Sequence, residues 1–217
     1  MARPIRTVPA ILTDNATALE KLVRQTESFT DYAQFDLMDG KFVPSHSYSV
    51  DDLVDLKTNI KWEAHLMMLQ PEEYLEKLKN AGAQKIVFHY EAVASCWNLI
   101  LLIRQLGMKI GMAINPETPI AVLKEWVPEI NSVLFMAVHP GYYGAKFIPE
   151  VLDKIREFRR NYALIEIGID GGIKENNITE IAGTGVDVIY IGSAIFLQPD
   201  PAAAYRRLTE LAQSGAA

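Results

Sequence analysis

The chain has 217 residues, of which 49% are hydrophobic and 22% charged, and its formal net charge is −6. This length fits one domain with an ample core, so we expect a single domain over residues 1–217. The negative charge argues against a general nucleic-acid surface, and the apolar runs are too short to span a membrane. The single cysteine, Cys96, excludes an internal disulfide, which favours a reducing, cytoplasmic setting.

Short apolar runs typical of strands buried on both faces alternate with segments of helical periodicity. The predicted strands span residues 7–12, 32–37, 61–67, 85–89, 109–114, 132–138, 164–169 and 188–191. The predicted helices span residues 16–26, 71–81, 99–106, 149–158, 177–185 and 202–211. Strict alternation at about 27 residues per unit predicts a parallel α/β fold, a closed (β/α)₈ TIM barrel. An open doubly wound sheet is the alternative, but the turn after the first predicted strand lacks the glycines that such a sheet favours.

In a (β/α)₈ barrel, the functional rim is formed by the C-terminal ends of the strands. The second and seventh predicted strands end near Asp36 and Asp170, and three histidines, His65, His89 and His139, come at the ends of the third, fourth and sixth. An isolated Asp36 would most simply cap a helix or brace a turn. Because Asp170 brings a second carboxylate to the same rim, the two aspartates instead favour a pair that acts in general acid–base catalysis.

A metal site is also compatible with these strand ends. Asp36, His65 and Asp170 supply oxygen, nitrogen and oxygen donors, a set that suits Zn, Mn or Fe. The alternative is that Glu63 and His65 pair with each other inside the barrel.

Three methionines, Met38, Met67 and Met136, recur near the same layer. Stray methionines usually fill the core. Three at one rim could instead form a polarisable lining that excludes water beside a negative charge that develops during a reaction.

Glycine-rich turns follow the last two predicted strands. Barrels of this type commonly bind phosphate there, through loop N–H groups and a short helix. Gly171-Gly172 and Gly192-Ser193 occupy these places, and residues 193–196 could form the helix. A loop over residues 141–144 could close over a ligand.

Motifs in order along nearly the whole chain resemble the ribulose-phosphate 3-epimerase family. They are Asp36-Leu-Met-Asp-Gly-Lys-Phe-Val-Pro44, His65-Leu-Met67, Phe88-His89-Tyr-Glu-Ala92, Asn115-Pro-Glu-Thr-Pro119, His139-Pro-Gly141, Lys146-Phe-Ile-Pro149, Asp170-Gly-Gly172 and Gly192-Ser-Ala-Ile-Phe196. The first of these is highly specific.

The resemblance implies a cytoplasmic isomerase of the ribulose-phosphate-binding barrel type. Its expected reaction interconverts D-ribulose 5-phosphate and D-xylulose 5-phosphate, with one of Asp36 and Asp170 removing the C3 proton and the other returning a proton from the opposite side. One divalent ion, Zn, Mn, Fe or Mg, is expected on Gln34, Asp36, His65 and Asp170. The substrate is expected to contact further residues of the chain, which are Met38, Met67, Met136, His139, Gly141, Gly144, Gly171, Gly172, Gly192 and Ser193. A phosphorylated ketose and further copies of the chain, in a homo-oligomer, are the expected partners, with no nucleic acid and no membrane.

The chain departs from the family pattern at the expected site. The usual first metal-ligand histidine is Gln34, which predicts weaker zinc binding or a preference for Mn or Mg. A usual serine is Ala10, the residue before Pro140-Gly141 is His139, and a glutamate two before Asp170 is Gly168. Two further hypotheses therefore stay open, an epimerase of another sugar phosphate and a catalytically lapsed protein that binds one.

Overall fold

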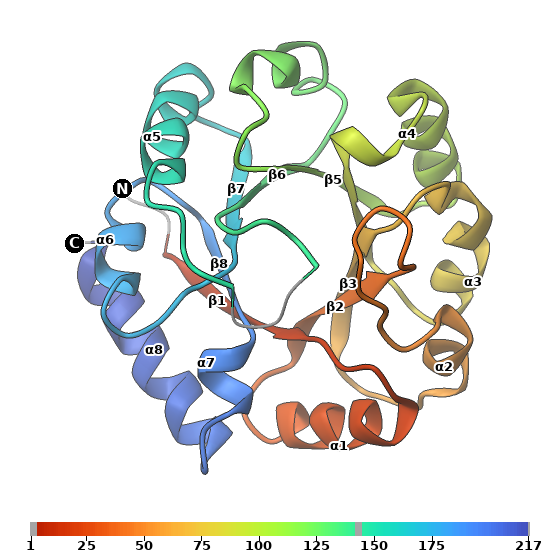
Figure 1. Cartoon of the computed structure of the whole chain (residues 1–217), viewed down its shortest axis with the longest axis horizontal. Helices are drawn as coiled ribbons and strands as arrows, with labels where there is room; N and C mark the ends of the chain where they lie inside the picture. The colour runs from red at the N-terminus through yellow and green to blue at the C-terminus, as the bar shows by residue number, and fades with distance from the viewer. Residues whose placement is uncertain (1–3, 142–144, 217) are drawn as a thin grey trace.

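A computed structural model describes residues 4–141 and 145–216. In these residues eight parallel strands close into a barrel in chain order, with β8 pairing to β1 (Figure 1). The strands are β1 (Arg6–Ile11), β2 (Tyr32–Met38), β3 (Lys61–Met67), β4 (Lys85–His89), β5 (Lys109–Ile114), β6 (Ser132–Met136), β7 (Glu166–Asp170) and β8 (Val188–Ile191). The predicted (β/α)₈ barrel is confirmed.

The helices surround the barrel on its outside, as Figure 1 shows. They are α1 (Ala16–Glu27), α2 (Val50–Asp55), α3 (Leu75–Asn80), α4 (Cys96–Gln105), α5 (Val151–Asn161), α6 (Ile178–Ala182), α7 (Ser193–Phe196) and α8 (Pro201–Gly215). Three short 3₁₀ helices join them, η1 (Pro71–Tyr74), η2 (Tyr90–Ala92) and η3 (Ile120–Glu125). One of these, η1, opens the segment that the periodicity predicts as a single helix over residues 71–81.

One helix that the sequence does not predict, and one strand that begins later than predicted, each have a physical reason. Helix α2 is not predicted because its six residues are too few to show periodicity; a capping box, in which Ser49 and Asp52 bond each other's backbone N–H groups, begins it. Strand β7 begins at Glu166 rather than at Leu164, whose side chain is 83% exposed and lies outside the sheet.

The outer faces of the strands and the inner faces of the helices share one large hydrophobic core. The predicted apolar stripe of α5 shows the pattern, because Val151, Leu152, Ile155 and Phe158 are all buried. The Phe158 ring packs edge-on against Phe135 of β6, with centroids 5.5 Å apart. Strand residues that point outward, such as Phe135, are thus buried beneath the helices, which explains why the strands are nearly continuous in apolar residues.

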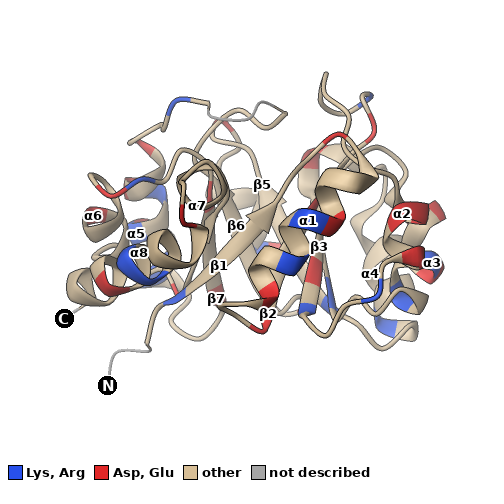
Figure 2. Cartoon of the chain, turned by 90° about the horizontal axis from the view of Figure 1, so that it is seen from below, with Lys and Arg blue, Asp and Glu red and all other residues tan. Residues whose placement is uncertain are grey.

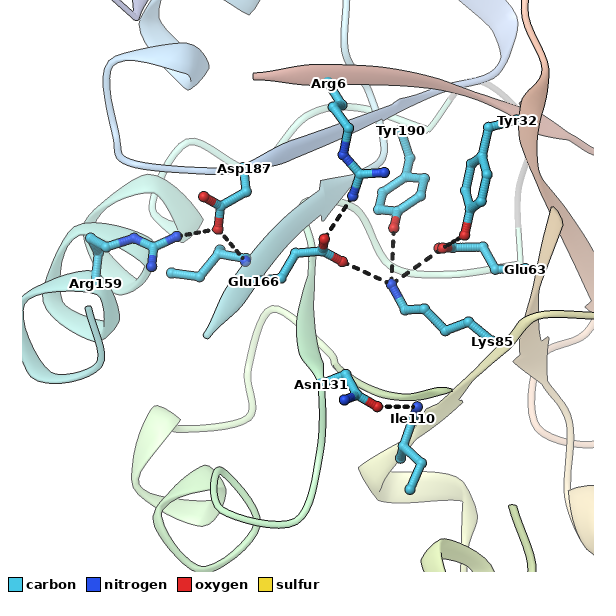
Figure 3. Close-up of polar contacts among 11 residues, drawn as sticks. Arg6, Tyr32, Glu63, Lys85, Ile110, Asn131, Arg159, Glu166, Asp187 and Tyr190 are labelled. Atoms are coloured by element: carbon cyan, nitrogen blue, oxygen red, sulfur yellow. Dashed lines mark hydrogen bonds and ion pairs between the residues drawn. The ribbon is translucent and has the colours of Figure 1, made fainter. Parts of the chain in front are cut away.

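The N-terminal half of the barrel interior is closed by a buried polar cluster, which we call the barrel floor (Figure 3). The Lys85 ammonium lies 3.2 Å from Glu63 Oε2 and 3.1 Å from Glu166 Oε1. The Tyr32 hydroxyl donates to Glu63 at 2.7 Å. Glu63 is therefore occupied by Lys85 and Tyr32, and the alternative that it pairs with His65 is wrong. Charges of both signs meet there, so each buried ion has a partner of opposite charge.

Tyr190 completes the barrel floor, and Gly168 makes room for it. A Cβ built at Gly168 would lie 2.7 Å from Tyr190 Cε2, closer than real side-chain contacts come. The Tyr190 hydroxyl reaches within 3.5 Å of the Lys85 ammonium. The glycine two residues before Asp170 thus accommodates an aromatic ring in the barrel interior.

The outer surface carries both signs of charge along its helices, as the side view in Figure 2 shows. Cys96 is buried with a free thiol and packs in the hydrophobic core. Within residues 4–141 and 145–216, no helix has the length and apolar character to cross a bilayer.

Candidate functional site

The strand register brings the predicted site residues to one face. Parallel pairing sets Asp36 of β2 opposite His65 of β3, and Met136 of β6 opposite Asp170 of β7. Side chains paired in this way point to the same side of the sheet, here the barrel interior. They share a cavity at the C-terminal ends of the strands, the end at which barrels of this class carry their sites.

Most of the residues predicted to form the site line this cavity. They are Asp36, Met38, His65, Met67, Met136, Gly141, Asp170, Gly171, Gly172, Gly192 and Ser193. Ala10, which stands where the family has a serine, lines it as well. Two predicted residues are placed elsewhere: Gln34 lies beneath the cavity, fully buried, and His139 is exposed and pairs with Glu117 at 3.2 Å. Gly144 lies outside the described residues.

Gln34 joins the two aspartates. Its side-chain amide donates to Asp36 Oδ1 at 2.9 Å and to Asp170 Oδ2 at 2.7 Å. Its Oε1 atom is buried and has no hydrogen-bond partner among the described residues. A buried amide oxygen without a partner costs free energy, which turning the amide over would recover if a cation lay between the carboxylates. The sequence predicts Gln34 as a ligand but does not reveal that its N–H₂ group can hold the two acids together.

The carboxylates of Asp36 and Asp170 share their site with the ring of His65. Nδ1 of His65 lies 3.0 Å from Asp36 Oδ1 and 3.9 Å from Asp170 Oδ2. The three donor atoms lie within 4.8 Å of one another; the His65 side chain is fully buried, and those of Asp36 and Asp170 are 9% and 13% exposed. Two carboxylates and one imidazole nitrogen at this spacing suit a divalent ion. The residues present therefore fit a metal ion, and Oε1 of Gln34 would be a further oxygen donor once its amide is turned over.

Burial perturbs both acids. It raises the pKa of Asp36 to about 8, against the opposing hydrogen bond from Gln34. Burial and the nearby charge of Asp36 raise the pKa of Asp170 to about 7. Two carboxylic acids that titrate close to neutral pH can each exist in the acid or the base form during a reaction. Such perturbation is typical of functional sites.

The raised pKa values predict that the metal-free protein loses stability as the pH rises from about 6.5 to about 8.5. A group whose pKa is higher in the folded state stabilises the fold below its unfolded pKa, and this contribution is lost as the pH rises through the folded pKa. For Asp36 and Asp170 the loss begins near their ordinary pKa of 3.8 and is complete above about pH 8, so the interval from pH 6.5 to 8.5 covers its last part. We expect a decrease on the order of 2 kcal/mol, which is roughly 5 °C in Tm.

Thermal unfolding in the presence of a chelator measures this decrease. The double variant Asp36→Asn, Asp170→Asn is the control, because neither amide ionises, and its Tm should change less over the same interval. A wild-type Tm that stays level or rises between pH 6.5 and 8.5 would contradict the assignment of the raised pKa values.

Backbone groups form the opposite side of the cavity. Gly172 has a φ of +66°, and a Cβ there would lie 2.8 Å from the Phe147 backbone, so only glycine fits. Helix α7 begins at Ser193, directly after Gly192, and its first N–H groups have no partner within the helix. These two turns offer N–H donors where barrels of this type hold an anion.

The methionines and a neighbouring loop enclose the remaining space. Met38, Met67 and Met136 are all less than 10% exposed. Val43, from the loop that follows β2, packs with Met38 and Met67. The Ser45 hydroxyl of that loop donates to the carbonyl oxygen of Gly141 across the mouth of the cavity. The lining is thus apolar next to the acids and hydrogen-bonded at its edge.

Two side chains beside the cavity, the buried His89 and the partly buried Glu91, have no specific role in the sequence prediction, although His89 is one of the strand-end histidines noted there. His89 Nε2 lies 2.9 Å from His65 Nε2, and Glu91 Oε2 lies 3.5 Å from His89 Nδ1. The signal that could have identified them is the His-x-Glu spacing directly after β4, at the rim where the other site residues lie.

Comparisons with known proteins agree with this geometry. The model of the "Ribulose-phosphate 3 epimerase family" matches residues 6–196. A ribulose-phosphate 3-epimerase from Synechocystis is 37% identical over 213 residues, covering 94% of this chain and 93% of its own length. The epimerase from Escherichia coli is 36% identical over 200 residues, covering 88% and 89%. The epimerase from Schizosaccharomyces pombe is 32% identical over 199 residues, covering 89% and 87%.

Solved structures support the fold. KGPDC from Streptococcus mutans superposes with a TM-score of 0.74 at 12% identity, covering 97% of this chain and 98% of that one. A 3-hexulose-6-phosphate synthase from Salmonella typhimurium gives a TM-score of 0.71 at 14% identity, covering 95% and 98%. At these identities the likeness is one of fold alone.

Proposed function

The chain belongs to the ribulose-phosphate 3-epimerase family, and from this we propose that it interconverts D-ribulose 5-phosphate and D-xylulose 5-phosphate. It is an isomerase that acts on a carbohydrate phosphate. The observation that carries the proposal is the pair of buried carboxylic acids, Asp36 and Asp170, in one cavity and joined by one amide.

Asp36 and Asp170 would act as the two acid–base groups. They come from β2 and β7, on different sides of the barrel interior (Figure 1). Epimerisation at C3 requires that a proton leave one face of the ketose and return to the other. A single base would tend to return the proton to its original face, whereas two carboxyl groups can serve the two faces. Their pKa values near neutrality suit both proton removal and proton donation.

Asp36, His65 and Asp170 would hold a divalent ion, with Gln34 as a fourth ligand through Oε1. When bound, such an ion supplies positive charge beside the ketose oxygens and so makes the C3 proton more acidic. Because Gln34 offers an amide oxygen instead of an imidazole nitrogen, we infer a preference for Mn or Mg over Zn.

The other lining residues would bind and shield the substrate. Backbone N–H groups around Gly171, Gly172, Gly192 and Ser193 would donate hydrogen bonds to the phosphate. The three methionines would exclude water next to C3, which strengthens the electrostatic effects of the acids. The predicted homo-oligomer stays a prediction.

A substrate panel tests the proposal. Purified protein loaded with Mn²⁺ is incubated with pentulose and hexulose phosphates, and the epimers are quantified by NMR. We expect the highest kcat/KM for D-ribulose 5-phosphate. A higher value for a hexulose phosphate would favour the other open hypothesis, a reshaped substrate site. Phosphate-dependent binding without turnover on any of these compounds would overturn the proposal in favour of a lapsed binding protein.

A further inference from the structure

Three side chains in contact, His65, His89 and Glu91, form a row that leads away from the candidate metal site; we call this row the file. It starts at His65 on β3, passes to His89 at the end of β4 and ends at Glu91 in η2. His65 and His89 meet Nε2 to Nε2 at 2.9 Å, with ring centroids 5.1 Å apart and ring planes inclined by 22°, so the two rings lie edge to edge. His89 Nδ1 then lies 3.5 Å from Glu91 Oε2. Both imidazoles are fully buried, and neither His89 nor Glu91 lines the cavity.

The far end of this file is fixed by the loop after β5. Glu91 Oε1 accepts a hydrogen bond from the Asn115 backbone N–H at 2.8 Å and another from the Thr118 hydroxyl. Burial opposes ionisation of Glu91, but the nearby His89 ring and the hydrogen bonds from Thr118 and Asn115 outweigh it and hold the pKa of Glu91 below its usual value. Glu91 is therefore a carboxylate, which can only accept hydrogen bonds.

An acceptor at the end of the file sets the direction of every bond in it. Burial lowers the pKa of His89 to about 4, so its ring is neutral at pH 7. Its Nδ1 lies 3.5 Å from the Glu91 carboxylate, a contact too loose to count as a hydrogen bond, but an N–H there is attracted to the carboxylate whereas a lone pair would be repelled. We therefore assign the proton to Nδ1, which leaves Nε2 as the acceptor. Two imidazole nitrogens 2.9 Å apart need one proton between them, and that proton must then belong to Nε2 of His65. His65 consequently presents an unprotonated Nδ1 to Asp36 and Asp170.

We propose that Glu91, acting through His89, is a positioning residue that holds His65 in its Nε2–H tautomer, so that the Nδ1 lone pair faces the two aspartates. This inference rests on the proposed function, because it assigns the orientation of one ligand in the candidate metal site. With Nδ1 unprotonated, the 3.0 Å contact to Asp36 Oδ1 joins two acceptors unless a proton or cation lies between them. The file thus prepares the site for a positively charged occupant.

Partners that orient a ligand histidine usually contact it directly, and their loss typically lowers metal affinity by 10–100-fold. Here a second imidazole lies between the carboxylate and the ligand. Phe42 packs against His89 with ring centroids 4.9 Å apart, which restricts rotation of that second ring. The carboxylate can therefore act on His65 from two residues away.

The first test needs no variant. In metal-free wild-type protein, ¹⁵N NMR of the histidine rings should show an unprotonated Nδ1 and a protonated Nε2 for His65. A protonated Nδ1 on His65 would overturn the proposal, because the file would then run in the opposite direction.

The second test compares Glu91→Gln with Glu125→Gln, a matched loss of charge at an exposed position of η3. We expect Glu91→Gln to weaken Mn²⁺ binding by about 10–100-fold and to shift His65 away from the Nε2–H tautomer, and Glu125→Gln to change neither. Glu91→Asp, which keeps the acceptor, should restore the tautomer. A Glu91→Gln variant with the wild-type tautomer and wild-type Mn²⁺ affinity would overturn the proposal. If wild-type protein bound no divalent ion at all, the proposed metal site would be wrong, whatever the tautomer of His65.

Discussion

Replacing either Asp36 or Asp170 by asparagine should lower kcat for epimerisation by about 10²–10⁴-fold, the range for loss of a general acid or base. Asparagine keeps the size of the side chain but cannot take up a proton at neutral pH. The fold should persist, because the substitution removes a buried acid whose ionisation is itself unfavourable. Steady-state kinetics on D-ribulose 5-phosphate, with circular dichroism to verify folding, measures the effect.

Asp153→Asn is the matched control, because Asp153 is an aspartate of α5 whose side chain is 85% exposed. It should retain wild-type kcat. If Asp36→Asn or Asp170→Asn were folded and fully active, the assignment of that residue as an acid–base group would be wrong.

Replacing Gln34 by histidine should tighten zinc binding by at least about tenfold, the lower bound seen when even an outer partner of a metal ligand changes. Gln34 already reaches both acids from a fully buried position, so a ring at this position would face the same atoms. Zinc prefers imidazole nitrogen to amide oxygen, whereas manganese distinguishes less between them. The gain should therefore be larger for Zn²⁺ than for Mn²⁺.

Competition with a chromophoric chelator measures both affinities. Gln34→Leu is the control, because it removes the amide without adding a donor and should weaken binding of both ions. Equal zinc affinities for wild type and Gln34→His would show that position 34 does not contribute to the metal site.

The fold could be predicted because each strand of this barrel is buried on both faces and each helix carries one apolar stripe. The alternation of the two patterns is local, as in β6 followed by α5 with its buried Ile155 and Phe158. Helix α2 could not be found in this way, since its capping residues determine it and six residues leave no period to detect.

Much of the candidate site could also be predicted from the sequence, because strand ends meet at one rim and Asp36, His65 and Asp170 are all strand-end residues. What the sequence could not reveal is how polar groups pair across the barrel. Glu63 forms an ion pair with Lys85 and accepts a hydrogen bond from Tyr32, so His65 contacts His89 instead. These pairings depend on distances between strands that are far apart in the chain.

His139 shows the limit of transferring a position by its motif. It follows β6 at the expected place, yet its side chain points to solvent, 68% exposed, and pairs with Glu117. A loop residue next to the rim can turn either way, because no strand register constrains its direction. Its predicted contact with the substrate stays a prediction.

The most direct test of the paired acids is the deuterium content at C3 after reaction in D₂O. Wild-type protein should convert D-ribulose 5-phosphate into D-xylulose 5-phosphate that carries one deuterium at C3, seen by NMR and mass spectrometry. Asp36→Asn and Asp170→Asn should each lose net conversion, and residual exchange at C3 should favour opposite epimers in the two variants. Product formed by wild-type protein without deuterium, or the same epimer preference in both variants, would contradict a mechanism in which two carboxyl groups serve opposite faces of the sugar.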